Sequence, residues 1–261
     1  MGTPYKTITT YNFGCKLNFS ETSTIARELI NCGYILVNND QNAQFHIINT
    51  CTVTENADDK IKKLIRKINS SDNNAKIIVV GCYAQIASDK IAKLPGVFMV
   101  LGNNDKYKIP TLLENTNLDK KNIQANFNDL NNFISSYSIH ERVRSFLKVQ
   151  DGCDYNCTYC TIPLARGQSR SGKIKDLIND AHIIAKHNIK EIVLTGVNIG
   201  DFNQNNESLI DLFIQLEKID LIKRIRLSSI EPNLLTNEII DYISKSKKIL
   251  PHFHLPLQSG C

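Results

Sequence analysis

The sequence predicts an α/β protein in which an N-terminal, doubly wound parallel sheet is followed by a partial (β/α) barrel. Three observations predict this fold class. Short apolar segments alternate with helical patterns, a polar aperiodic segment interrupts the alternation once, and the alternation then resumes. Short, continuous apolar strands between helices are typical of a parallel sheet that helices cover.

The N-terminal domain, residues 1–115, contains four strand-helix repeats. We expect strands at 5–10, 45–49, 76–80 and 97–101. Helical patterns fill the gaps, at 18–32, 57–68, 84–94 and about 106–114. Asn18 or Ser20 is placed to cap the first helix, and Gly33 is placed to end it.

The C-terminal domain, residues 143–261, repeats the alternation after a polar linker at 116–142 that leaves room for one short strand. We expect strands at 145–149, 191–195, 224–228 and 253–257, with helices at about 175–188, 209–219 and 237–245. Repeated βα units of this kind favour a barrel. Because the sequence ends at Cys261, directly after a predicted parallel strand, we expect the barrel to be truncated at its C-terminus.

The composition is that of a soluble globular protein. Of 261 residues, 42% are hydrophobic and 22% are charged, which excludes a disordered, collagen-like or coiled-coil chain. No segment approaches the roughly 18 apolar residues of a membrane span, and the first residues do not resemble a secretory signal. We therefore expect a cytoplasmic protein without a membrane partner, whose eight cysteines stay reduced.

The excess positive charge lies in one short segment. Residues 142–175 contain seven Lys or Arg and two Asp, so this segment accounts for the whole net charge of +5. It also contains the densest group of cysteines. A basic segment beside a cysteine site indicates an anionic partner, of which nucleic acid is the leading candidate. The alternative is an ordinary solvated loop.

The strongest motif is C-x3-C-x2-C, formed by Cys153, Cys157 and Cys160. It follows the C-terminal end of a predicted strand, where α/β barrels place their chemistry. Three thiolates can hold three irons of a [4Fe–4S] cluster and leave one iron open, whereas ferredoxin-type clusters use four cysteines. The alternative is a structural zinc site with a distant fourth ligand.

A second group of cysteines is spread along the N-terminal domain. Cys15, Cys51 and Cys82 each lie just past the carboxyl end of a predicted strand. In an open α/β sheet these ends share one edge, where ligand crevices form. We therefore expect the three to converge, although a single cysteine is more often a small buried apolar residue.

These motifs resemble known families. C-x3-C-x2-C with an aromatic residue before the last cysteine is the signature of the radical S-adenosylmethionine (SAM) superfamily. The segments GCKLN, NTCTVT, GCYAQ and KVQDGCDYNCTYCTIPLARGQSRS stand in the order found in radical-SAM methylthiotransferases. NTCTVT and VQDGC…ARGQSRS look most like the branch that acts on N6-threonylcarbamoyladenosine at position 37 of tRNA.

The resemblance implies two [4Fe–4S] clusters, SAM, a tRNA substrate and an electron donor such as flavodoxin or ferredoxin. Cys153, Cys157 and Cys160 are then the catalytic cluster ligands, and Cys15, Cys51 and Cys82 hold the second cluster. In this superfamily the first cluster splits SAM to a 5′-deoxyadenosyl radical. In methylthiotransferases the second cluster carries the sulfur. Candidate SAM-binding residues are Tyr159, Arg166, Arg170, Asn198 and Glu231, and the two arginines alternatively contact RNA phosphate.

Three alternatives remain at this point. In one alternative the substrate is isopentenyladenosine in tRNA, and in another it is a ribosomal protein; other branches of the family modify these two substrates. A non-catalytic iron–sulfur or zinc RNA-binding module, or an inactive fragment of the enzyme, is the alternative from a different class. The family usually adds a small RNA-binding domain, called TRAM, after the barrel. We expect this sequence to lack that domain and the last two barrel strands.

Overall fold

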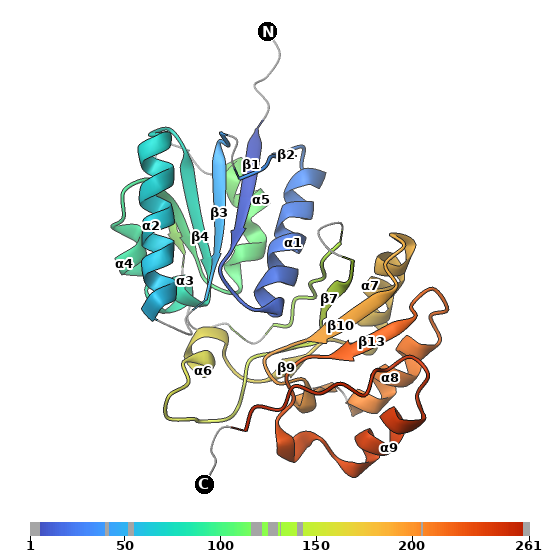
Figure 1. Cartoon of the computed structure of the whole chain (residues 1–261). Helices are drawn as coiled ribbons and strands as arrows, with labels where there is room; N and C mark the ends of the chain where they lie inside the picture. Colours follow the sequence, from blue (N-terminus) through green and yellow to red (C-terminus); the bar gives the residue numbers. More distant parts are fainter. Residues whose placement is uncertain are drawn as a thin grey trace. The chain divides into compact units, whose positions relative to one another are not determined.

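The computed structural model describes residues 6–39, 42–51, 55–115, 122–124, 130, 132–139, 143–204 and 206–257. The chain divides into two compact units (Figure 1). The N-terminal unit comprises Met1–Leu130 together with Thr158–Arg166, and the C-terminal unit comprises Asn131–Cys157 and Gly167–Cys261. Most of the predicted linker and residues 258–261 lie outside the described residues.

A parallel sheet forms the centre of the N-terminal unit. Its strands run in the order β2-β1-β3-β4-β5-β6, and every described pair is parallel. Four strands lie close to the predicted positions: β1 (Thr7–Asn12), β3 (Phe45–Thr50), β4 (Lys76–Gly81) and β5 (Val97–Leu101). The edge strands β2 (Ile35–Leu36) and β6 (Asn122–Gln124) extend the sheet beyond them.

Helices cover both faces of this sheet, as the doubly wound prediction requires (Figure 1). Alternate strand residues point to opposite faces: Ile47 and Ile78 pack with α1 (Lys16–Asn31) and α5 (Ile109–Asn115), whereas Ile48 and Ile77 pack with α2 (Glu55–Ser71). The remaining elements are α3 (Cys82–Ile86), α4 (Ser88–Ala92), the 3-10 helix η1 (Asp105–Lys108) and α6 (Ile162–Arg166).

Two local predictions in this unit differ from the structure. The helix predicted at 84–94 is divided at Ala87, whose backbone is not helical, into α3 and α4. Helix α1 begins at Lys16, so Cys15 occupies the N-cap position and Asn18 and Ser20 lie inside the helix. Asn18 instead directs its side chain at the end of β3, because its amide nitrogen bonds Asn49 and Thr50.

The C-terminal unit contains a three-stranded parallel sheet in the order β13-β10-β7. Its strands are β7 (Ser145–Lys148), β10 (Glu191–Thr195) and β13 (Arg224–Leu227). Apolar residues of these strands pack against α7 (Ile174–Lys186), α8 (Leu209–Glu217) and α9 (Asn237–Lys245) in one core. The shorter elements are β8 (Gln150–Asp151), β9 (Arg170–Ser171), η2 (Ile199–Asp201), β11 (Asn203–Gln204), β12 (Glu207–Ser208) and η3 (Pro232–Leu234).

The strand predicted at 253–257 does not form as a continuous strand. Only isolated bridges occur in this region, between Ile225 and Ile249 and between Ser229 and His254. Pro251 precedes the segment and Pro256 lies within it, and a proline donates no backbone hydrogen bond to a ladder. In the described part of the chain, no helix is long and apolar enough to cross a membrane.

Candidate metal centres

The three N-terminal cysteines follow adjacent strands of one sheet. Cys15 comes after β1, Cys51 after β3 and Cys82 after β4. Because β1, β3 and β4 are parallel neighbours, their carboxyl ends lie at the same edge. Cys82 is buried, Cys51 is half-buried and Cys15 is exposed.

Gly81 brings the end of β4 close to β3. Its φ of +96° lies in the left-handed region that favours glycine. A Cβ at this position would come within 2.5 Å of the Thr50 carbonyl oxygen. Glycine before Cys82 therefore lets the backbones of the two strands approach where their cysteines begin.

Hydrogen bonds from Asn18 connect these strand ends. Its side-chain nitrogen donates to the Thr50 carbonyl at 3.0 Å and to Asn49 Oδ1 at 3.2 Å. Its Oδ1 accepts from the Cys15 thiol at 3.3 Å. Thr50 in turn donates from Oγ1 to the Val80 carbonyl at 2.6 Å. The residue before Cys51 is thus held to α1 and to the end of β4.

A buried arginine reaches the same edge from α6. Arg166 is 1% exposed, and its Nε donates to Cys82 Sγ at 3.1 Å. Its two terminal nitrogens donate to the Glu21 carboxylate at 3.0 and 3.1 Å. Lys106 contacts the same carboxylate at 2.6 Å. The site therefore combines sulfur atoms with a fixed, buried cation, which favours an anionic sulfur ligand.

The pKa of Cys15 depends on the charged groups of the same site. Cys15 keeps an exposed surface, but the protein packed around its thiol raises the pKa of that thiol by desolvation, and Arg166 opposes this increase. Electrostatic repulsion from Cys82 and Glu21 also raises the pKa of Cys15. Because metal ligation requires the thiolate, a metal that binds here must displace this proton.

Sequence reasoning did not identify Glu21 or Lys106 as site residues. A signal was present in α1, whose first half is polar but buried, including Asn18, Ser20, Glu21, Thr22, Ser23 and Thr24. Ordinary surface helices bury an apolar stripe. A buried polar stripe next to a cysteine indicates that the helix faces a polar site.

The second cysteine group lies in a loop closed by a short hairpin. β8 and β9 pair antiparallel, with Gln150 opposite Ser171. Gly152 has a φ of +73°, and a Cβ there would lie 1.9 Å from the Gln168 carbonyl oxygen. Cys153 donates its backbone N–H to Gly167 at 3.1 Å. Cys153, Cys157 and Cys160 are each half-buried, and Cys160 belongs to the N-terminal unit.

Gln150 links this loop to the end of β10. It is fully buried, and its Nε2 donates to the Gly152 carbonyl at 2.8 Å. Its Oε1 accepts from the backbone N–H of Asn198 at 2.9 Å. Asn198 Oδ1 accepts from the backbone N–H of Glu231 at 3.2 Å. The predicted residues Asn198 and Glu231 therefore lie together at the carboxyl ends of β10 and β13.

The carboxylates of Asp154, Asp201 and Glu231 lie near enough to one another to repel. Burial raises the pKa of Asp201, and the negative charges of Asp154 and Glu231 raise it further. Hydrogen bonds from Asn198 and Ser169 act in the opposite direction. The folded state therefore favours the protonated form of Asp201 more than the unfolded chain does.

This imbalance gives a pH dependence. Since the folded-state pKa of Asp201 is raised, the free energy of unfolding should fall as the pH rises from below 3.8 through the raised pKa. We expect Asp201→Asn to reduce this fall, measured by urea unfolding at a series of pH values. Asp220→Asn, at an exposed position, is the control. An unaltered pH profile in Asp201→Asn would contradict the repulsion.

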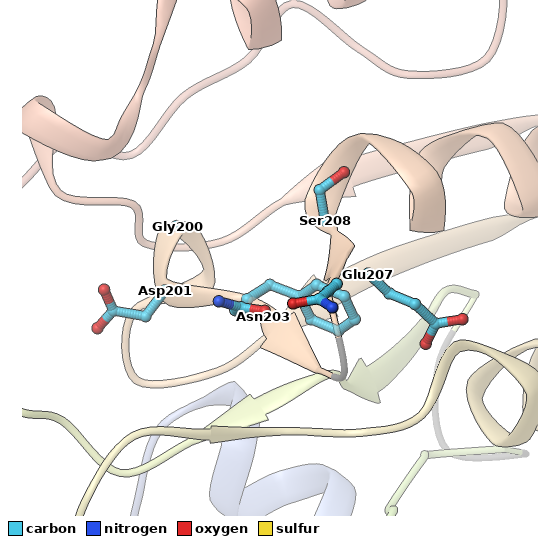
Figure 2. A pocket seen from close by; sticks show the side chains of 7 residues that line it. Gly200, Asp201, Asn203, Glu207 and Ser208 are labelled. Carbon is cyan, nitrogen blue, oxygen red and sulfur yellow. The ribbon is translucent and has the colours of Figure 1, made fainter.

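A shallow hollow of about 510 Å³ surrounds the β11–β12 turn (Figure 2). Figure 2 shows the carboxylates of Asp201 and Glu207 at opposite ends of it. Glu207 turns toward the start of α7, where it accepts from the backbone N–H of Ile174 at 3.3 Å. These carboxylates do not converge. Among the described residues, no group of three His, Cys, Asp or Glu is arranged to hold a single metal ion.

The other two predicted residues differ in exposure. Tyr159 is 67% exposed. Arg170 donates to the carbonyls of Asn132 and Gln168 at 3.1 and 2.9 Å and contacts Asp151 at 3.3 Å. It lines a hollow of about 410 Å³ with Asn132, Phe133, Ser135, Ser171, Gly172, Lys173 and Asp176.

The basic segment is partly neutralised within the protein. Lys148 is buried and paired with Asp151 at 2.7 Å, and Arg166 is paired with Glu21. Lys173 and Lys175 are exposed, and Arg144 is half-buried and lies 3.8 Å from Glu191. Only part of the charge excess is therefore available to an external anion.

Comparison with known proteins matches two families. The profile described as "Uncharacterized protein family UPF0004" matches residues 7–102, and that of the Radical SAM superfamily matches residues 147–261. The first range contains Cys15, Cys51 and Cys82, and the second contains Cys153, Cys157 and Cys160.

Curated relatives match both parts of the chain together. Threonylcarbamoyladenosine tRNA methylthiotransferase MtaB of Thermotoga maritima is 37% identical over 98% of this chain and 59% of its own length. tRNA-2-methylthio-N(6)-dimethylallyladenosine synthase of Orientia tsutsugamushi is 33% identical over 95% of this chain and 59% of its own length. The chain thus spans about three fifths of these relatives.

A solved structure shares the fold. The radical SAM methyltransferase TsrM from Kitasatospora setae, with cobalamin and a [4Fe–4S] cluster bound, superposes with a TM-score of 0.60. It is 11% identical, and the match covers 97% of this chain and 61% of TsrM. Both profiles and both relatives agree: the chain combines a UPF0004 region with a Radical SAM region, and along both regions it is similar to tRNA methylthiotransferases.

Proposed function

We propose that this chain carries out radical methylthiolation of C2 of N6-threonylcarbamoyladenosine at position 37 of tRNA. One observation supports the proposal above all. Two separate groups of three cysteines, one at a sheet edge and one in a C-x3-C-x2-C loop, occur in a chain that is 37% identical to an MtaB enzyme.

Each cysteine group would hold one [4Fe–4S] cluster. Cys153, Cys157 and Cys160 would bind the cluster that engages SAM, and Cys15, Cys51 and Cys82 would bind the second. Three thiolates per group fit a cluster with one open iron, and the buried Arg166 beside Cys82 suits the negative charge of a thiolate-bound cluster. When bound, the clusters would supply one-electron chemistry on SAM and a sulfur atom for transfer.

The polypeptide itself would position the reactants. The C2 hydrogen of adenine is not acidic, so no side chain needs to act as a general base, and cofactor chemistry replaces it. Gln150 and Asn198 would fix the cysteine loop against the end of β10, where Asn198 and Glu231 would face SAM. Tyr159 would pack near the adenine, and Arg170 would contact SAM or phosphate.

RNA contact would use the exposed part of the basic segment. Lys173 and Lys175 lie on the surface at the start of α7. Cations of this kind contact phosphates through salt-dependent attraction without reading sequence. An electron donor such as flavodoxin or ferredoxin would reduce the clusters.

The choice of substrate rests on the relatives. MtaB proteins of three bacteria are 34 to 37% identical to this chain, whereas the dimethylallyladenosine synthases are 30 to 33% identical. This difference agrees with the segments NTCTVT and ARGQSRS, which resemble the threonylcarbamoyladenosine branch.

Mass spectrometry of tRNA nucleosides from a deletion strain tests the proposal. We expect 2-methylthio-N6-threonylcarbamoyladenosine to disappear and N6-threonylcarbamoyladenosine to accumulate. The wild-type gene should restore the modification, and the same gene carrying Cys157→Ala should not. Loss of the methylthio group from isopentenyladenosine, or from a ribosomal protein, would assign the chain to another branch.

A further inference from the structure

Helix α6 brings a residue from the radical-SAM motif into the N-terminal cysteine site. It begins at Ile162, two residues after Cys160, and ends at Arg166. Residues Thr158–Arg166 belong to the N-terminal unit, where α6 packs against α3. Asn103 fixes this position because its Nδ2 donates to the Ala165 carbonyl at 2.7 Å.

Two N–H groups point at the sulfur of Cys82. Arg166 Nε lies 3.1 Å from Sγ, and Asn103 Nδ2 lies 3.8 Å from it. Lys106 orients the Asn103 amide by donating to its Oδ1 at 2.8 Å. Neutral thiols are weak acceptors, whereas an ionised sulfur accepts strongly. This arrangement therefore suits a sulfur that carries negative charge.

Glu21 fixes the direction of the arginine. Its two oxygens accept from NH1 and NH2 of Arg166, which is the bidentate geometry that a rigid guanidinium favours. The Nε–H then has one direction left, toward Cys82. A buried ion pair gives little net stability against apolar residues of the same size, so stability alone is a weak reason for this network.

We infer that Arg166 is a positioning residue for the second cluster, holding the Cys82 sulfur and making the reduction potential of that cluster less negative. The inference rests on the proposed function. Its physical basis is general, since hydrogen bonds to ligand sulfurs and nearby charge set the potentials of iron–sulfur clusters. A cationic donor stabilises the reduced form, which carries one more electron.

The test uses the full chain with Cys153, Cys157 and Cys160 replaced by alanine, so that reconstituted iron reports the second cluster alone. Arg166→Gln and Arg166→Lys are compared with this parent by iron content and by redox titration followed with electron paramagnetic resonance. Arg27→Gln is the control, because Arg27 lies on α1, the helix that carries Glu21, and its guanidinium bonds the side chains of Ser23 and Thr24.

We expect Arg166→Gln to shift the midpoint potential to a more negative value. A tenfold loss in stabilisation of the reduced cluster corresponds to about 59 mV for one electron. Arg166→Lys should lie between Arg166→Gln and the parent, because it keeps the charge but loses the guanidinium geometry. Arg27→Gln should match the parent.

An iron-loaded Arg166→Gln variant with the parent's midpoint would overturn the inference. If that variant does not load iron, Arg166→Lys decides, since it retains a cation for Glu21: a negative shift supports the inference and an unchanged midpoint overturns it. Absence of iron from the parent overturns the proposed function, and this inference with it. The two failures are therefore distinguishable.

Discussion

Alanine at Cys153, Cys157 or Cys160 is expected to abolish SAM cleavage. Each thiolate would hold one iron of the cluster that engages SAM, so each substitution would leave that cluster only two protein ligands. The measurement is 5′-deoxyadenosine formed per chain after anaerobic reconstitution and reduction with dithionite.

Cys32→Ala is the matched control for this series. Cys32 is an exposed cysteine at the C-cap of α1, outside both groups of three. This variant should bind iron and form 5′-deoxyadenosine like the unaltered chain. Normal product from any one of the three alanine variants would remove the radical-SAM assignment. Bound zinc in place of iron would favour a non-catalytic module.

The sequence predicted the central elements well because their signals are local. β5 and β10 are buried at every position and lie where the continuous apolar segments predict them. α9 has both an apolar face and a Thr236 cap, and its predicted ends are correct. By contrast, β2 consists of two exposed residues, Ile35 and Leu36. Such a short strand depends on its pairing with β1, so no local sequence pattern predicts it.

The sequence likewise predicted one part of the candidate site and not another. The strand-end rule predicted that Cys15, Cys51 and Cys82 lie at one sheet edge, because it needs only the order of parallel strands. It could not predict the partner of Cys82, since Arg166 is 84 residues away and arrives from a segment after the predicted linker. Sequence position beside the C-x3-C-x2-C motif suggested SAM or phosphate as the partner. The structure directs the guanidinium to Cys82 and Glu21.

Cys51→Ala should separate the two cysteine groups functionally. Among the N-terminal three, Cys51 is the best choice for substitution, because Cys82 is bonded to Arg166 and Cys15 is the N-cap of α1. We expect reconstituted iron to fall by about half, from roughly eight to roughly four per chain, if each group binds one [4Fe–4S] cluster. SAM cleavage should remain measurable, because the three cysteines of the C-x3-C-x2-C loop are unaltered, whereas methylthiolation of tRNA should be lost.

The readouts of this variant distinguish a sulfur-carrying site from a structural one. Cys51 precedes a segment outside the described residues and follows Thr50, whose hydrogen bonds to Val80 and Asn18 do not involve the cysteine side chain. Alanine keeps the Cβ of this half-buried residue, so the thermal midpoint of the metal-free chain should change little. If SAM cleavage vanished while the remaining cluster stayed intact, the two groups would not act separately. If iron stayed at the full level, Cys51 would not be a ligand, and the second cluster would have to use other residues.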